Sequence, residues 1–300
     1  MKLSKDAFSR AEEFIYSNAR RLDVRLFEHH FKGGSKDNVL QELKKYQNSD
    51  GGFGNAIEPD FRLTASSAMA ASVGLQYCVE VDTDSNDEII TTAMDYLVTT
   101  FSIEHAYWQK TPVLVNDAPH APWWHVDEIK PPAEPSWANP NAELLGYLHR
   151  FQEHVPMEIL VQGRKRALEN LNNLDTIESL YCFMCWERTY QSLPEPVKSL
   201  ISVKVEKTLQ TFEPNPDTLG EIRVFWIAPT PESFLLSFPS HICSLHDYEM
   251  DRQGEDGGWW PTWKWGQYED VWPIAEREWA GKITVGNLIA MDKFNLLNDA

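Results

Sequence analysis

One short segment of the chain combines several groups capable of acid–base chemistry. Residues 116–125, NDAPHAPWWH, contain a carboxylate, two imidazoles and two indoles, and two prolines stiffen the backbone. A carboxylate or an imidazole can act as a general base, and indole faces can bind apolar chains, sugar rings or cations. The alternative interpretation is a buried polar loop whose groups are satisfied by its own backbone. The candidate catalytic residues are Asp117, His120 and His125, and the candidate binding residues are Trp123 and Trp124.

Tryptophan is concentrated in two proline-rich connections. Ten of the 12 tryptophans lie in residues 108–137 and 259–279. Loops carry binding residues more often than cores do, so Trp263 and Trp265 are further candidates for substrate binding. An equally good interpretation is that loops without regular structure need large side chains to fill the space beneath them.

Two heptapeptides share the pattern Q-x-x-D-G-G-aromatic. They are QNSDGGF at 47–53 and QGEDGGW at 253–259. An aspartate followed by two glycines suits a tight turn with positive φ, and the glutamine can bond backbone groups at a neighbouring helix end. The aromatic residue then fills the space between helices. We therefore predict that Asp50 and Asp256 are structural.

Each heptapeptide is followed by a second shared pattern, E-x-x-x-[RK]-[LI]-T. The first copy runs from Glu58 through Arg62 to Thr64, and the second from Glu278 to Thr284. Each threonine is predicted to be the N-cap of a buried helix, which places the glutamate near the positive end of the helix dipole. Glu58 and Glu278 are candidate catalytic acids, and Arg62 is a candidate binding residue. The alternative is an ion pair between each glutamate and the base four residues later.

Apolar residues recur at steps of three and four along most of the chain, and strict alternation is absent. This periodicity predicts an all-α fold of about ten helices. The stretches 64–79 and 283–296 are predicted to be buried helices, whereas 36–47, 86–101 and 195–212 have charged outer faces. Alternating surface and buried helices are typical of rings or solenoids of helical hairpins.

The repeated Q-x-x-D-G-G-[FW] pattern, between a surface helix and a buried helix, resembles the repeat of the squalene–hopene cyclase and protein prenyltransferase superfamily. The segments QNSDGGFGNAIEPD and NDAPHAPWW also resemble a bacterial branch of that superfamily. The resemblance implies an α/α toroid of about five or six helical hairpins. It implies a single domain over residues 1–300, with long loops at about 102–140 and 251–282. It also implies an isoprenoid-like small-molecule ligand in a central cavity. The reaction stays unassigned and could be cyclase-, transferase- or hydrolase-like.

The catalytic motifs of that superfamily are not reproduced. Asp82–Ser85 lacks the fourth acid of D-x-D-D, and Ser85 with Glu88 is predicted to form a capping box for the next helix. Cys182 and Cys185 form a C-x-x-C inside an apolar helical stretch, which predicts a buried pair of small residues.

One segment offers residue types that bind zinc, but its spacing does not match the zinc motif of the prenyltransferases. We therefore predict no metal and no cofactor, and the sequence leaves metal binding by this segment as an open alternative. The residues of this segment are His241, Cys243, His246 and Asp247.

The net charge is −18, from 45 acidic and 27 basic residues. This balance disfavours nucleic acid and anionic membranes as partners. No apolar run is long enough to span a bilayer and no signal sequence is recognised, so no membrane insertion and a cytoplasmic location are expected, with reduced cysteines. The sequence leaves the oligomeric state open. It also leaves open a carbohydrate-active or glycan-binding toroid, or a binding scaffold without catalysis.

Overall fold

The computed structural model describes residues 1–133, 136–177, 179–211, 215–220, 222–237 and 239–298, with the side chains of 237 and 239–241 outside the description. Within these residues the chain is helical and forms isolated β-bridges but no β-strand, so the all-α prediction is confirmed. The chain divides into two compact units. Unit 1 contains residues 1–42 and 212–300, and unit 2 contains residues 43–211.

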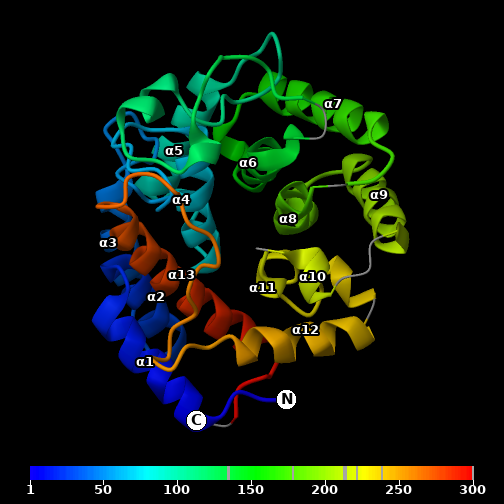
Figure 1. Cartoon of the computed structure of the whole chain (residues 1–300). Helices are drawn as coiled ribbons and strands as arrows, with labels where there is room; N and C mark the ends of the chain where they lie inside the picture. Colours follow the sequence, from blue (N-terminus) through cyan, green and yellow to red (C-terminus); the bar gives the residue numbers. More distant parts are fainter. Residues whose placement is uncertain (134–135, 178, 212–214, 221, 238, 299–300) are drawn as a thin grey trace. The chain divides into compact units, whose positions relative to one another are not determined.

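Unit 1 combines the two ends of the chain. Its helices are α1 (Lys5–Asn18), α2 (Arg21–Phe31), α3 (Lys36–Leu43), α10 (Pro216–Leu219), α11 (Val224–Ile227), α12 (Pro239–Asp251) and α13 (Trp272–Lys293). The blue helices α1 and α2 pack against the orange α13 in Figure 1. The Leu3 amide donates to the Leu296 carbonyl at 2.8 Å, and the Asn298 amide donates to the Leu3 carbonyl at 3.2 Å. These bonds fasten the first residues to the end of α13.

Unit 2 is built around α6, which packs against α4, α7 and α8. A Cβ at Gly146 of α6 would lie 2.2 Å from Thr189 Cβ, so α6 and α8 approach closely there. The α-helices of this unit are α4 (Ala68–Glu80), α5 (Glu88–Thr100), α6 (Ala138–Arg150), α7 (Met157–Asn173), α8 (Leu180–Thr189) and α9 (Val197–Thr211). The long connection between α5 and α6 contains the 3-10 turns Val113–Asp117 and Pro122–Trp124.

Both copies of the repeated heptapeptide form the same turn. In the first, Asp50 Oδ1 accepts from the Gly52 amide at 3.0 Å, and Gln47 Nε2 donates to the Gly51 carbonyl at 2.9 Å. The second copy makes the corresponding bonds at 3.1 and 2.9 Å. The prediction that both aspartates belong to a turn is confirmed.

Each turn is held against the first residues of a further helix. Gln47 Nε2 also donates to the Ile89 carbonyl of α5 at 3.0 Å, and Gln253 Nε2 donates to the Ala7 carbonyl of α1 at 2.8 Å. The first glycine has φ +83° in one copy and +89° in the other. A Cβ there would lie 2.1 Å from the Thr92 carbonyl oxygen in unit 2. Glycine is therefore required both by the backbone conformation and by the close contact.

Two predicted N-caps are wrong. Helix α4 begins after Ser67, whose hydroxyl caps it, because Thr64 still belongs to the turn, where its carbonyl accepts from the Asn55 amide. Thr284 lies inside α13, and its hydroxyl donates to the Ala280 carbonyl at 2.7 Å. Serine and threonine both serve as N-caps, so the residue type alone did not exclude Thr64 in favour of Ser67.

The start of α5 and the start of α13 also differ from the prediction. The N-cap of α5 is Asp87 and not Ser85, since Asp87 Oδ1 accepts from the Ile89 amide at 3.0 Å. Helix α13 begins at Trp272, with a proline in its first turn, so the preceding loop ends at residue 271. Glu278 therefore lies within a helix.

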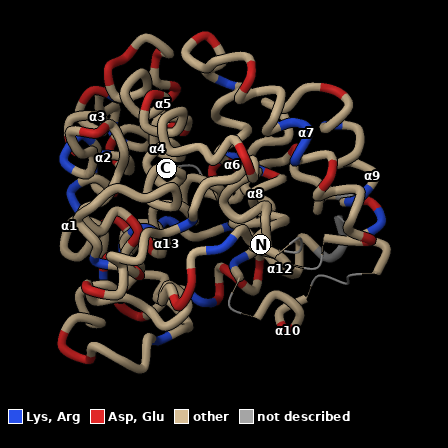
Figure 2. Tube along the Cα trace, turned by 90° about the horizontal axis from the view of Figure 1, so that it is seen from above, with Lys and Arg blue, Asp and Glu red and all other residues tan. Residues whose placement is uncertain are grey.

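Acidic and basic residues are distributed over both units, as the red and blue segments of Figure 2 show. No helix of the described residues is long and apolar enough to cross a membrane.

Candidate functional site

Two loops of unit 2 bring several of the predicted site residues together. The Arg62 amide donates to the Pro119 carbonyl at 2.8 Å, and the Ala121 amide donates to the Asp60 carbonyl at 2.7 Å. Phe61 and His120 thus form an antiparallel bridge. This pairing places the Glu58–Arg62 segment beside the histidine- and tryptophan-rich segment, although 58 residues separate Arg62 from His120 in the sequence. Glu58 and His120 are both buried.

His120 and His125 form a connected pair. His120 Nδ1 lies 2.6 Å from the Ala118 carbonyl oxygen, which can only accept, so Nδ1 carries a proton. In neutral His120 the other nitrogen, Nε2, then accepts from His125 Nδ1 at 3.2 Å. His125 Nε2 lies 3.6 Å from Asp127 Oδ1. Because His125 is 48% exposed and His120 only 3%, the pair can pass a proton between solvent and a buried imidazole.

Trp124 and Lys110 lie at the same loop pairing. The Trp124 ring is buried and packs edge-on against Phe61, with centroids 5.1 Å apart. Lys110 Nζ lies 4.5 Å from the centroid of the Trp124 ring. Burial lowers the pKa of Lys110, while the neighbouring thiols of α8 and the carboxylate of Glu58 act in the opposite direction.

Lys110 was missed by the sequence reasoning, although the sequence contains a signal for it. It is the only lysine or arginine between Arg62 and Lys130. A single base in a long acidic and apolar stretch is unusual on a solvated surface, where charges of both signs are interspersed.

A buried carboxylate, Glu143, joins three helices of unit 2. It is 1% exposed and accepts from Gln76 Nε2 of α4 at 2.7 Å, from the Tyr147 hydroxyl of α6 at 2.7 Å and from Arg188 of α8 at 3.1 Å. Burial and the Glu143 carboxylate raise the pKa of Tyr147, so its hydroxyl keeps its proton. Burial disfavours the charged form of Arg188, but Glu143 raises its pKa. The Arg188 side chain is 25% exposed, so this network reaches solvent at one end.

The α8 thiols are buried, as predicted for the C-x-x-C. Burial raises the pKa of both Cys182 and Cys185, which keeps them as thiols at neutral pH. The Glu143 carboxylate adds to the rise in the Cys185 pKa, and Lys110 acts in the opposite direction.

The other predicted site residues have different surroundings. Asp117 is exposed, Trp123 is 51% exposed and Arg62 is half-buried, all in unit 2. In unit 1, Glu278 is half-buried on α13. Trp263 and Trp265 are buried and pack against other tryptophans. For Trp263 and Trp265 the structure therefore favours the interpretation that large side chains fill the space beneath a loop.

The segment with zinc-binding residue types is used for packing. His246 stacks on Phe225 and meets Phe294 edge-on, and burial lowers its pKa to about 4. Asp247 binds the N-terminal amine of Met1 at 2.9 Å, and Cys243 is exposed. The side chain of His241 lies outside the described residues. Among the residues that the structure describes, no group of three or more histidines, cysteines and acids has the arrangement of a metal site.

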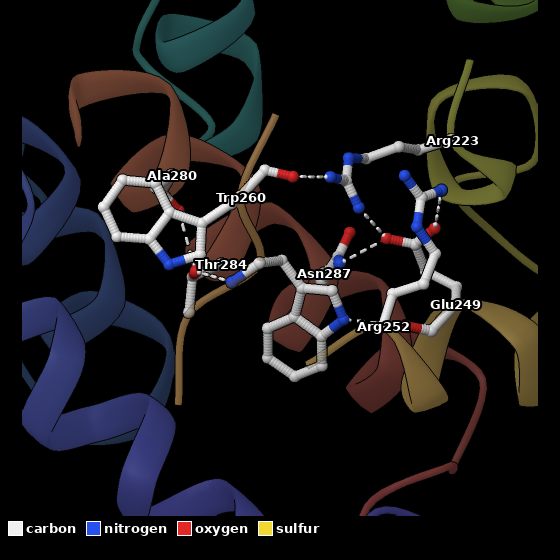
Figure 3. A network of polar contacts seen from close by, with 8 residues as sticks. Arg223, Glu249, Arg252, Trp260, Ala280, Thr284 and Asn287 are labelled. Atoms are coloured by element: carbon white, nitrogen blue, oxygen red, sulfur yellow. Dashed lines mark hydrogen bonds and ion pairs between the residues drawn. The ribbon is translucent and has the colours of Figure 1, made fainter. Parts of the chain in front are cut away.

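Unit 1 contains a second buried carboxylate network, around Glu249 of α12 (Figure 3). Glu249 accepts from Arg223, from Arg252 at 3.4 Å and from Asn287 of α13 at 2.9 Å. Arg223 also donates to the Trp260 carbonyl and is 1% exposed. These bonds join α12 and α13 to the residue before α11.

A hollow of about 370 Å³ lies on the surface between α7 and α9. Val161, Leu168 and Val197 form its apolar part, and Arg164, Lys165 and Glu195 contribute charged groups. It contains none of the predicted site residues.

No family model matches the chain, and no curated protein or solved structure is significantly similar to it. The chemical assignment therefore depends on the loop pairing of unit 2. That pairing combines a buried acid, two connected imidazoles, an amine and a pair of packed aromatic rings.

Proposed function

We propose that this chain binds an isoprenoid-like small molecule at the loop pairing of unit 2. The polar end of the ligand lies near Glu58, Lys110 and His120, and the apolar part lies against Phe61 and Trp124. The observation that carries the proposal is the antiparallel pairing of Phe61 with His120, which groups acid–base side chains with a buried aromatic pair.

The proposed reaction class is a cyclase- or transferase-like proton transfer. The connected imidazoles of His120 and His125 accept a proton released in the reaction and pass it to solvent, and Glu58 orients the polar end of the ligand. In this proposal the two units belong to one α/α toroid of five or six hairpins, acting in the cytoplasm. The identical turns found in each unit support the toroid.

A glycan is the second candidate ligand. Trp123 is 51% exposed, beside the exposed His125, and a free indole face of this kind can stack on a sugar ring. The buried state of Trp124 favours the apolar ligand over this alternative.

The experiment measures retention of farnesol, an isoprenoid alcohol, and of maltotriose by native mass spectrometry. We expect farnesol to be retained and maltotriose to be lost. The variant Glu58→Gln should weaken farnesol retention by about tenfold, because one charge-assisted hydrogen bond is lost, while its thermal midpoint stays close to the wild type. Glu104→Gln, which changes an 83% exposed acid between α5 and α6, is the matched control. Retention of maltotriose alone would favour the glycan, and a Glu58→Gln variant that unfolds earlier with full retention would assign Glu58 to loop structure.

A further inference from the structure

The hollow between α7 and α9 of unit 2 follows one face of α7. The two helices pack against each other (Figure 1). The α7 residues that line the hollow, from Val161 to Asn172, recur at steps of three and four, so they form a single face about 16 Å long. With a volume of about 370 Å³, the hollow falls in the range of small-molecule sites.

The apolar part of the hollow comes from both of its walls. Val161 is 45% exposed and Leu168 is half-buried on α7, and Pro196 and Val197 contribute from the start of α9. A single exposed valine on a convex surface is ordinary. Here the apolar side chains line a concave surface, which can cover a hydrocarbon chain on more than one side.

Both carboxylates of the hollow already have partners. Glu169 Oε1 lies 3.9 Å from Lys165 Nζ, one turn earlier on α7. Glu195 Oε2 accepts from the Ser199 amide at 3.1 Å, at the start of α9. These contacts leave one basic residue of the hollow without a carboxylate.

That residue is Arg164, which is half-buried at the middle of the α7 face. Its Nε donates to the Leu160 carbonyl at 3.3 Å. Within the part of the chain that the structure describes, its two terminal nitrogens donate to no group. A guanidinium held at Nε in this way still presents the pair of N–H groups that matches a carboxylate.

Arg150 provides a comparison within the same unit. Its guanidinium lies 5.8 Å from the centroid of the Phe151 ring, so it too has an apolar neighbour. Its Nη2, however, already donates to Asp82 Oδ1 at 3.1 Å. The two arginines therefore differ in whether a carboxylate is bound.

We propose that the hollow between α7 and α9 binds a medium-chain fatty acid. The carboxylate pairs with the terminal nitrogens of Arg164, and the hydrocarbon chain lies against Leu168 and Val197. A single negative charge suits the site, because the nearby carboxylates of Glu169 and Glu195 repel more highly charged anions such as phosphates. The hollow contains none of the residues of the loop pairing, so this inference does not rest on the proposed function.

The first arm of the test uses the wild-type chain with methyl groups labelled for NMR. Decanoate, hexanoate and decanol are titrated separately at pH 7.5, and the methyl signals of Val161, Leu168 and Val197 report binding. We expect these signals to shift and saturate with decanoate. Hexanoate should bind at least about tenfold more weakly, because four methylenes are no longer buried. Decanol should bind at least about threefold more weakly, because it lacks the charge that pairs with Arg164.

Three outcomes of this arm would overturn the proposal. They are the absence of saturable shifts at these methyl groups, shifts with decanoate that occur only elsewhere in the chain, and decanol binding as tightly as decanoate. No variant has to fold for any of these results.

The second arm tests whether Arg164 recognises the carboxylate. Arg164→Gln should weaken decanoate binding by at least about threefold and change decanol binding by less than about twofold, because only decanoate forms the ion pair. Arg150→Gln, which removes the same charge outside the hollow, should bind decanoate like the wild type. Equal losses in the two variants would assign the effect to net charge, and undiminished decanoate binding by Arg164→Gln would exclude the ion pair; either result would overturn the proposal.

Discussion

The Glu143 network of unit 2 and the Glu249 network of unit 1 are built alike. Each glutamate is 1% exposed and accepts from one amide side chain and from arginine. The two networks differ in the solvent exposure of the arginine. Arg188 keeps 25% of its side-chain surface, whereas Arg223 is 1% exposed.

This difference determines what each network can do. Among the described residues, the buried guanidinium of Arg223 donates to Glu249 and to the Trp260 carbonyl and to no other group, so the pair acts as a fixed connection between helices. Burial lowers the pKa of Arg223, against the effect of Glu249, which makes the carboxylate essential to its charge. Arg188 can turn toward water if its partner is lost. The carboxylate–guanidinium pair therefore holds helices together in unit 1, whereas in unit 2 the arginine can exchange its carboxylate partner for water.

The largest expected effect follows from breaking the Glu249 network, because Arg223 is 1% exposed although Arg252 keeps 17% of its side-chain surface. Glu249→Gln leaves Arg223 buried without a counter-charge, and the free energy of unfolding should fall by about 3–5 kcal/mol. Urea unfolding followed by circular dichroism measures the loss. Glu255→Gln, an exposed acid of the same unit, should change stability by less than about 0.5 kcal/mol. A loss below about 1 kcal/mol for Glu249→Gln would show that Arg223 finds another partner.

The matched change in unit 2 should have a smaller effect. In Glu143→Gln the remaining carbonyl oxygen still accepts from Gln76 and Tyr147, and Arg188 can be hydrated at its exposed side. We expect a loss of about 1–2 kcal/mol by the same urea measurement. A loss as large as that of Glu249→Gln would contradict the comparison, because it would mean that hydration of the exposed side of Arg188 does not compensate for the lost carboxylate.

How far the sequence could predict the structure depends on whether a feature is set by neighbouring residues or by residues distant in the chain. The all-helical fold and the repeated turn are local properties: helical spacing of apolar residues, and a glycine that must adopt positive φ. The contacts of the buried charged residues are not local properties, because their partners come from other helices. Nothing in the spacing around Glu143 or Glu249 shows that a guanidinium and an amide from other helices approach it.

The candidate site could be predicted only in part, because some of its features lie in one segment and others depend on contacts between distant segments. His120 and Trp124 could be found because their residue types cluster in one segment. Their pairing with the Glu58–Arg62 segment depends on backbone bonds between distant loops, which composition does not encode. Whether Trp124 was exposed or buried also depended on that pairing, so both interpretations remained open from the sequence.

The last prediction concerns how the stability of unit 1 depends on pH through a histidine on the helix of Glu249. His246 lies on α12, three residues before Glu249, with a folded-state pKa of about 4 against an ordinary value of 6.5. Because the folded pKa is depressed, the neutral ring favours the folded state above pH 6.5, and this stabilisation is lost as the pH falls toward 4. Between pH 7 and pH 5 the wild type should lose about 1–2 kcal/mol through this residue. His246→Phe keeps the stacking on Phe225 and cannot be protonated. Urea unfolding at pH 7 and pH 5 should therefore show a loss of stability in acid that is smaller than that of the wild type by about 1–2 kcal/mol. The control His105→Gln changes a 47% exposed histidine and should retain the acid loss of the wild type. An acid loss in His246→Phe equal to that of the wild type would show that the unfolding of unit 1 in acid begins elsewhere, with protonation of the carboxylates around Arg223 as the next cause to test.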